Sequence, residues 1–544
     1  MPNNLKALLV VLVMAVAMFQ FARPLALAVG SRRDFDRRCC IWLGLTAVAF
    51  LVPSFWLFVL VAAPLLFWAA RHDDNPFALY LFMLHVIPPV QVNVPIVGIN
   101  KLFAMDVYRL LDLCVLLPFA LKLWREKGRQ AAPIRWMDFF VLGYGLLQIL
   151  LFVRPDTADA ATMHDSVTNM LRRAFLYAID VGVVYYVASR FCRTRERLVE
   201  AMAAFAIATL VMAPVAVFET ARHWLLYKEM GTTWGSFLNS GYLLRGGVVR
   251  AMASSGDSLA LGYLLAIAFG FWLYLGRRVG AVLRMGGIAA LLLGLIAAYS
   301  RGPWLGAVII YFVYMLLGPR AVARAFKATL IAGVAAVALL MSPLGPRIEK
   351  VVPFLGGQVD NFNILYREVL AERSLDMIRL HPYLGDQDAY AKLQDLRQGV
   401  GVIDFVNTYA DVAVFYGLIG LGLFVGLPLS GMFKDFRVVR KTRRSEPDLS
   451  LLGASLSACM VGTLVMIYTS SFIFGYAVLF YVLAGLGASY ASIGYVYQRG
   501  RSRASAVQPE RAAQARPQAL AALARMGGSV GGAGRSGARA FRFR

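Results

Sequence analysis

The chain has 544 residues, of which 59% are hydrophobic and 16% are charged, and this composition excludes an ordinary soluble globular protein. Its formal net charge is +24, but most basic residues lie in short clusters between apolar runs, as in membrane proteins, so nucleic acid is not an expected partner. The five cysteines have no metal-ligand spacing, and the sequence predicts neither a disulfide framework nor a zinc site.

The chain begins with an apolar segment, 5–29, that Arg23 and Pro24 interrupt. Residues 26–28 (ALA) resemble a signal-peptidase site. Because the sequence continues with many further apolar runs, we interpret this segment as an uncleaved helix.

The next apolar run, 39–70, is broken at Pro53 and is too long for one ordinary span and short for two. A helical hairpin and a kinked pair of helices both remain open. The basic segment 31–38 favours the cytoplasm, which puts the N-terminus outside for a hairpin, whereas a single span would violate the positive-inside rule.

The rest of the chain repeats apolar runs long enough to cross a bilayer. We therefore expect an all-α polytopic membrane protein with about 12–15 transmembrane helices and one large, partly helical periplasmic loop. The further spans are expected near 77–90, 108–124, 136–153, 173–189, 198–219, 254–276, 285–300, 303–318, 328–343, 409–432, 450–470 and 473–496.

Basic clusters between these spans set the expected orientation. By the positive-inside rule we assign five of them to the cytoplasm. They lie at 125–135, 190–197, 277–284, 320–327 and 434–444. The periplasmic face then receives the loops 91–107, 154–172, 220–249, 300–302 and 342–408.

The expected division of the chain follows these boundaries. The parts are N-terminal membrane helices (1–76), membrane core helices (77–341), a periplasmic loop domain (342–408), C-terminal membrane helices (409–496) and a cytoplasmic tail (497–544). The tail is rich in Arg, Ala and Gly, cannot bury a core, and is predicted to be disordered.

The loop 342–408 is the only long polar interval, and its middle shows helical periodicity. A loop of this length inside a compact domain is usually functional or disordered. We expect this one to fold and to carry chemistry.

Three arginines are expected on the outer face, where the positive-inside rule depletes arginine: Arg250, Arg301 and Arg367. Each one alone fits a snorkelling or helix-capping arginine equally well. As a group they suit a lipid-linked diphosphate, because guanidinium offers planar, bidentate, permanently charged donors. The sequence contains no phosphate-binding glycine loop and no Ser/His/Asp arrangement.

A transferase also needs a group that takes a proton from the acceptor hydroxyl. Candidates in the loop are Glu368, Asp376, His381, Asp386, Asp388 and Asp404. His381 precedes a proline, so a cap or turn is the more ordinary interpretation, whereas Asp404 lies beside the next span. Asn407 and Tyr409 are candidates for orienting a sugar hydroxyl.

Four sequence elements, taken in their order along the chain, resemble those of the O-antigen ligase and polymerase superfamily. The matching elements are Arg250 through Gly262, the Ser-Arg-Gly-x-Trp corner (Ser300, Arg301, Gly302, Trp304), Arg367 with a helix and Pro-x-x-Gly (Pro382, Gly385), and Asn407-x-Tyr409 before Tyr416-Gly417. The resemblance covers roughly 77–495 by the order of spans.

The resemblance implies a metal-independent glycosyltransferase of the bacterial inner membrane that needs no cofactor. Its substrates would be an undecaprenyl-diphosphate-linked oligosaccharide and a glycan acceptor, with other polysaccharide assembly or export proteins as further partners. Ligases of this superfamily usually have a histidine immediately before the asparagine, where this chain has Val406. That departure favours an exopolysaccharide polymerase over a ligase.

Two alternatives remain open. A ligase would place finished glycan on lipid A core or protein with the same donor chemistry. A flippase or other transporter would bind its substrate near the bilayer midplane and often shows internal repeats, which this sequence lacks. Arg301 at mid-membrane in a water-filled cavity would favour the transporter.

Overall fold

The computed structural model describes residues 3–94, 103–126, 136–151, 162–235, 244–245, 247–318, 361–396, 403–472 and 476–499. The chain divides into two units, Met1–Ala491 and Ser492–Arg544, and the elements below belong to the first, apart from the end of the helix Tyr476–Arg499. The expected span at 328–343, the basic cluster 320–327 and nearly all of the expected tail lie outside the described residues.

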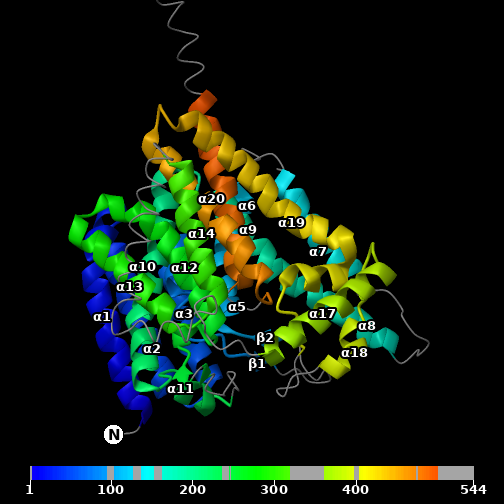
Figure 1. Ribbon diagram of the computed structural model, residues 1–544. Helices are drawn as coiled ribbons and strands as arrows, with labels where there is room; N and C mark the ends of the chain where they lie inside the picture. The colour runs from blue at the N-terminus through cyan, green and yellow to red at the C-terminus, as the bar shows by residue number, and fades with distance from the viewer. Residues whose placement is uncertain are drawn as a thin grey trace, which may run out of the picture. The chain divides into compact units, whose positions relative to one another are not determined.

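Among the described residues, the regular structure of the first unit is helical apart from two short antiparallel ribbons (Figure 1). The helices are α1 (Asn3–Val29), α2 (Arg32–Leu51), α3 (Phe55–His72), α4 (Pro76–Met83), α5 (Val107–Leu111), α6 (Leu117–Glu126), α7 (Trp136–Leu151), α8 (Thr162–Tyr177), α9 (Val184–Phe191), α10 (Arg195–Arg222), α11 (Lys228–Thr233), α12 (Ser258–Leu275), α13 (Ala281–Ala297), α14 (Arg301–Leu317), α17 (Asn361–Leu380), α18 (Ala389–Lys392), α19 (Thr408–Thr442) and α20 (Pro447–Tyr468). The ribbons pair β1 (Val92–Asn93) with β2 (Ala104–Met105), and β3 (Leu244–Arg245) with β4 (Val248–Val249). Short π segments (Asp112–Leu116 and Ala178–Val183) join α5 to α6 and α8 to α9.

Within the described residues, eight helices are long and apolar enough to cross a membrane. They are Asn3–Val29, Phe55–His72, Met170–Phe191, Arg195–Arg222, Ser258–Arg278, Thr408–Thr442, Pro447–Tyr468 and Tyr476–Arg499, and α7, α13 and α14 are shorter apolar helices. The expected all-α polytopic membrane fold is confirmed.

Burial separates central helices from peripheral ones. The most apolar stretch of α12 is 94% buried, and those of α10 and α20 are each 83% buried, so these three helices form the centre. Helices that are apolar on every side are typical of such positions. In contrast, α1 and α3 are only 33% and 28% buried and present leucines such as Leu9 and Leu60 outward, as helices facing lipid do.

The run 39–70 forms two helices, α2 and α3, as the hairpin interpretation requires. The break at Val52–Ser54 is closed by Ser54, whose hydroxyl oxygen accepts from the Trp56 N–H (3.2 Å). Asn4, at the start of α1, donates to the carbonyl oxygen of Phe50 at the end of α2 (2.6 Å). The chain therefore crosses the unit three times in its first 72 residues.

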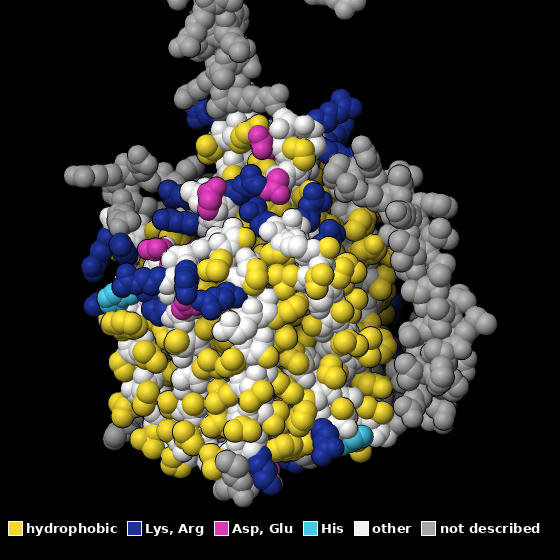
Figure 2. Space-filling view, turned by 90° about the vertical axis from the view of Figure 1, so that its left-hand side faces the viewer, with side chains coloured by type: hydrophobic (Ala, Val, Ile, Leu, Met, Phe, Trp, Pro, Cys, Tyr) yellow, Lys and Arg dark blue, Asp and Glu magenta, His cyan; other side chains and the backbone are white. Residues whose placement is uncertain are grey.

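One end of the helices, here called the basic face, is tied together by ion pairs among its turns. Arg38 binds Asp73 (2.5 Å) and Glu200 (2.9 Å), and Asp448 binds both Arg195 and Arg278 (3.3 Å from Arg278). The segment 31–38 and parts of two expected cytoplasmic clusters, 190–197 and 277–284, thus meet on one side, together with Asp448, which follows the cluster 434–444. Figure 2 shows Lys, Arg, Asp and Glu gathered above a broad hydrophobic band.

The expected span at 77–90 is wrong. Helix α4 has eight residues and ends at Met83, and the chain then continues in turns and extended backbone to β1. Irregular backbone at membrane depth is tolerated only where protein covers it, and residues 76–90 are all buried. The Ser254 hydroxyl satisfies the free carbonyl oxygen of His85 (2.7 Å).

The end opposite the basic face, here called the loop face, carries α11, the ribbons and the folded part of the long loop (Figure 1). Helices α17 and α18 share a small hydrophobic core with the segment 403–406 and the start of α19, which we call the loop core. Its buried members are Tyr366, Leu370, Met377, Ala389, Leu393, Ile403, Phe405 and Val414. The described part of the loop is therefore folded.

Candidate active site

Arg250 lies on the loop face beside a backbone segment that a buried carboxylate holds in place. Glu219 of α10 is fully buried, and its carboxylate accepts from the backbone N–H groups of Leu226 (2.9 Å), Met252 (2.9 Å) and Ala253 (2.8 Å). A charged group that accepts several backbone N–H bonds fixes their geometry strongly. Glu219 is thus the anchor of the Arg250 segment.

The same segment ends in Asp257, which caps α12 by accepting from Leu259 N–H (2.7 Å) and Ala260 N–H (3.2 Å). Burial raises the pKa of the Asp257 carboxyl, while the positive charge of Arg250 and the helix-cap bonds oppose the rise and the negative charge of Asp404 adds to it. Arg250, Asp257 and Asp404 therefore lie within electrostatic range of one another.

Arg301 is the first residue of α14, in a corner wedged against the end of α20. A Cβ on Gly302 would lie 2.4 Å from Oγ1 of Thr469, so the backbone at Gly302 packs directly against the Thr469 side chain. The Trp304 indole donates to the carbonyl oxygen of Leu295 (2.7 Å) and fixes the corner from the other side. The Ser-Arg-Gly-x-Trp pattern is therefore a packing device that presents Arg301.

Asp404 lies where the loop meets the end of α20. Its Oδ1 accepts from the Val406 N–H (3.0 Å) and from the Ser471 hydroxyl. Its backbone carbonyl oxygen accepts from the Tyr366 hydroxyl on α17 (3.2 Å). These bonds place the first half of α17, with Arg367, beside Asp404.

Arg367 and Arg301 come from different helices and interact electrostatically. Arg367 is exposed and Arg301 is partly buried. The Nε atoms of Arg250 and Arg301 are buried and have no hydrogen-bond partner among the described residues. The structure thus brings Arg250, Arg301, Arg367 and Asp404 to the loop face around the end of α20.

The loop is held to α19 by two glycines with positive φ. Gly417 (φ 64°) breaks α19, and a Cβ there would lie 2.2 Å from the carbonyl oxygen of Tyr383. Gly385 (φ 68°) closes the opposite side, and the Leu418 N–H donates to the carbonyl oxygen of Pro382 (2.8 Å). The Pro-x-x-Gly pattern at 382–385 and the Tyr-Gly pattern at 416–417 therefore pack against each other.

His381 does not join this group. It follows the last residue of α17, roughly 20 Å along the helix from Arg367. Its Nε2 lies 4.0 Å from Asp386, which is paired with Lys392 (2.5 Å). The structure places His381 among loop-stabilising groups, away from Asp404.

Asn407 and Tyr409 hold α19 in place. The Asn407 Oδ1 caps the helix, accepting from Tyr409 N–H (3.0 Å) and Ala410 N–H (3.4 Å). The Tyr409 hydroxyl donates to the carbonyl oxygen of Leu464 in α20 (2.8 Å). A sugar could still use the amide NH₂ of Asn407, and the ring and the acceptor lone pairs of the Tyr409 hydroxyl oxygen.

Sequence reasoning did not single out Glu219, Asp257 or Ser471. Asp257 carried a readable signal, because an aspartate just before an apolar run is a typical helix cap. Glu219 and Ser471 carried none, because their roles depend on backbone groups brought near by the fold. Among the described residues, no group of three or more His, Cys, Asp or Glu side chains is placed to hold a metal ion.

These features define a multi-pass, all-α membrane protein with a cluster of arginines and carboxylates at one end of its helices. Residues 286–425 match the family model for O-antigen ligase (Wzy_C), so the chain contains a domain of that family, as the resemblance predicted. The match includes Arg301, Arg367 and Asp404, while Arg250 lies before it. No curated protein matches the chain.

Proposed function

We propose that this protein is a polysaccharide polymerase that joins undecaprenyl-diphosphate-linked repeat units at the periplasmic face of the bacterial inner membrane. The observation that carries the proposal is the approach of Arg301 and Arg367, whose like charges repel. A diphosphate between them would turn this repulsion into attraction on both sides. Arg250 adds a third guanidinium, whose buried Nε has no hydrogen-bond partner among the described residues.

In the proposed reaction, a hydroxyl oxygen of the acceptor attacks the anomeric carbon of the donor sugar. The new C–O bond forms as the bond between that carbon and the diphosphate oxygen breaks, and the electron pair leaves with the diphosphate. The arginines stabilise the charge that develops there. Asp404 takes the hydroxyl proton, Ser471 and the Val406 N–H orient its carboxylate, and Asn407 and Tyr409 flank the sugar.

A ligase is the second candidate, since the family model includes that activity. Position 406 favours the polymerase, because the family's usual histidine is replaced here by valine. Val406 has a φ of 50°, and its N–H is held by Asp404 and Ser471 (3.1 Å from Ser471). The backbone at this position supports Asp404, while the side chain offers no proton-transfer group.

A transporter is less well supported. Arg301 begins α14 next to the end of α20, and its charge interacts with the exposed Arg367 of the loop. That position fits a surface site better than a binding site at the midplane, where transporters bind.

Purified protein in liposomes, supplied with lipid-linked repeat unit alone, tests the proposal. We expect a ladder of polymer, and Asp404→Asn should abolish it without changing membrane insertion. Transfer that begins only when a second acceptor is added would establish a ligase. If glycan is neither polymerised nor transferred but crosses the bilayer, the enzyme proposal is wrong.

A further inference from the structure

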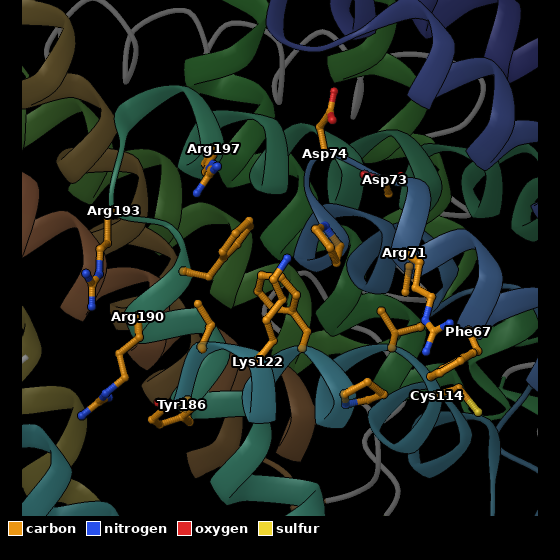
Figure 3. Close-up of a pocket in the computed structure, with 17 residues that line it drawn as sticks. Phe67, Arg71, Asp73, Asp74, Cys114, Lys122, Tyr186, Arg190, Arg193 and Arg197 are labelled. Carbon is orange, nitrogen blue, oxygen red and sulfur yellow. The ribbon is translucent and has the colours of Figure 1, made fainter. Parts of the chain in front are cut away.

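A cavity lies on the basic face, opposite the candidate active site. It has a volume of about 900 Å³ and is enclosed by the end of α3, by α6, by α9 and by the start of α10 (Figure 3). This volume is within the range of pockets that bind small molecules and cofactors. Asp73, one of its lining residues, binds Arg38 and so places the cavity on the basic face.

Four cations line the cavity without a carboxylate partner among the described residues. They are Arg71, Lys122, Arg193 and Arg197, and all four side chains are exposed. Lys122 lies near the centre of the view in Figure 3, with Arg193 and Arg71 on opposite sides. Like charges gathered around one hollow repel each other, so a bound anion would stabilise them.

The remaining charged lining residues do not cancel this charge. Arg190 is paired with Asp138 (2.5 Å), and Asp73 is paired with Arg38 (2.5 Å). Asp74 is the other carboxylate of the lining, and in Figure 3 it points away from Lys122. The cavity therefore keeps an excess of positive charge.

Aromatic rings orient two of the guanidinium groups. Arg71 lies over the ring of Phe67 (4.1 Å), and Arg197 lies over the ring of Phe191 (4.6 Å). A guanidinium stacked by its face keeps its N–H edge free to donate to phosphate oxygens.

Two exposed tryptophans next to lining residues in the sequence point to a lipid as the source of that anion. Trp68 and Trp124 directly follow the lining residues Phe67 and Leu123, and they are 48% and 67% exposed. Exposed tryptophans at the ends of apolar helices typically lie at the headgroup level of a bilayer. The lining also includes apolar side chains that an acyl chain or glycerol could contact, among them Pro118 and Phe119.

We propose that this cavity binds the phosphate-bearing headgroup of an anionic glycerophospholipid. Basic pockets between transmembrane helices are the usual sites for such headgroups. The proposal is independent of the active site, because its residues lie on the opposite face.

Native mass spectrometry of the detergent-purified protein with phosphatidylglycerol or phosphatidylethanolamine tests it, together with thermal unfolding during lipid titration. The test variant is K122Q/R193Q, and the charge-matched control is R437Q/R440Q at the basic-face end of α19. Arg437 is stacked on Phe433 (4.2 Å) much as Arg71 is stacked on Phe67, but it does not line the cavity.

Wild type and control should retain phosphatidylglycerol equally, and K122Q/R193Q should bind it roughly ten- to thirty-fold more weakly. Equal unfolding temperatures without lipid would show that the variant is folded. If it is not, K122Q alone should give a smaller loss in the same direction.

Equal retention by wild type and K122Q/R193Q would overturn the proposal. So would equal binding of phosphatidylethanolamine by the wild type. Inorganic phosphate alone is the third arm: if it stabilises the wild type but not the variant, the site takes a soluble phosphate and the lipid assignment is wrong.

Discussion

At the scale of single residues, the candidate site contains arginines whose partial burial costs free energy when no ligand is bound. Burial around the Nε atoms of Arg250 and Arg301 removes water from these groups, and no described residue replaces it. Unpaired buried donors cost free energy. A substrate whose oxygens reach them would recover that free energy on binding, as expected of a diphosphate.

Arg301→Ala and Arg367→Ala should each lower polymerisation about 10²- to 10³-fold, the usual effect of removing one preorganised donor to developing charge. Arg301→Lys should also be impaired, because an ammonium cannot bind a diphosphate in bidentate fashion. Polymer length on gels and the accumulation of single lipid-linked repeats measure both effects.

Arg379→Ala is the matched control for these variants. Arg379 lies at the far end of α17, is exposed, and among the described residues forms a surface pair with Asp376 alone (3.3 Å). Such pairs contribute little to stability. Polysaccharide of wild-type length in Arg301→Ala and Arg367→Ala would show that neither residue belongs to the site. A polymerisation defect in Arg379→Ala would mean that α17 tolerates no loss of charge.

At the scale of elements, the break in α19 is what positions the loop. A straight helix would continue its own hydrogen bonds through residue 417. Here the N–H groups of Leu418 and Ile419 instead bind the carbonyl oxygens of Pro382 and Tyr383 (2.8 and 3.3 Å). These two hydrogen bonds attach the loop backbone at 382–383 directly to the break in α19.

Gly417→Ala should destabilise this contact by about 1–3 kcal/mol from backbone strain alone, because its φ of 64° and ψ of −172° lie in a region that only glycine readily adopts. The Cβ would also meet Tyr383. We expect a lower unfolding temperature and faster proteolysis between 381 and 396.

Gly422→Ala is the control in the same helix, because nothing lies within 4 Å of its Cβ position. Replacing glycine by alanine inside a helix stabilises it by roughly 1 kcal/mol at most. Equal behaviour of the two variants would show that the break does not hold the loop.

The sequence was informative where local rules decide structure and uninformative where the fold does. Long apolar runs predicted α10, α12 and α20, and helical periodicity predicted α17. The predicted span at 77–90 is wrong because its apolar residues are buried by neighbouring protein, which permits a short helix followed by irregular backbone. At the site, Arg301, Arg367 and Asp404 were predicted and lie together, whereas His381 lies apart from them. The role of Glu219 was not predicted, because it depends on backbone groups that are distant in the sequence.

At the scale of the whole membrane unit, two faces carry different chemistry. The basic face joins the turns at 31–38, 73–75, 195–200 and 278 through ion pairs. The loop face carries Arg250, Arg301 and Arg367, alongside local ion pairs within the loop such as Asp386 with Lys392. By the positive-inside rule we expect the basic face to be cytoplasmic. The loop face would then lie outside. The N-terminus would lie there too, because Asn4 contacts the end of α2 that is opposite the basic face.

This orientation is tested by labelling introduced cysteines in intact cells with a maleimide that does not cross membranes, in a background with Cys39→Ala, Cys40→Ala and Cys114→Ala. The two remaining native cysteines, Cys192 and Cys459, are buried. Arg379→Cys on the loop should react in intact cells, and Arg440→Cys near the basic face should react only after lysis. The opposite pattern would put the arginines on the cytoplasmic side, where a periplasmic polymerase could not meet its donor, and the proposed function would be wrong.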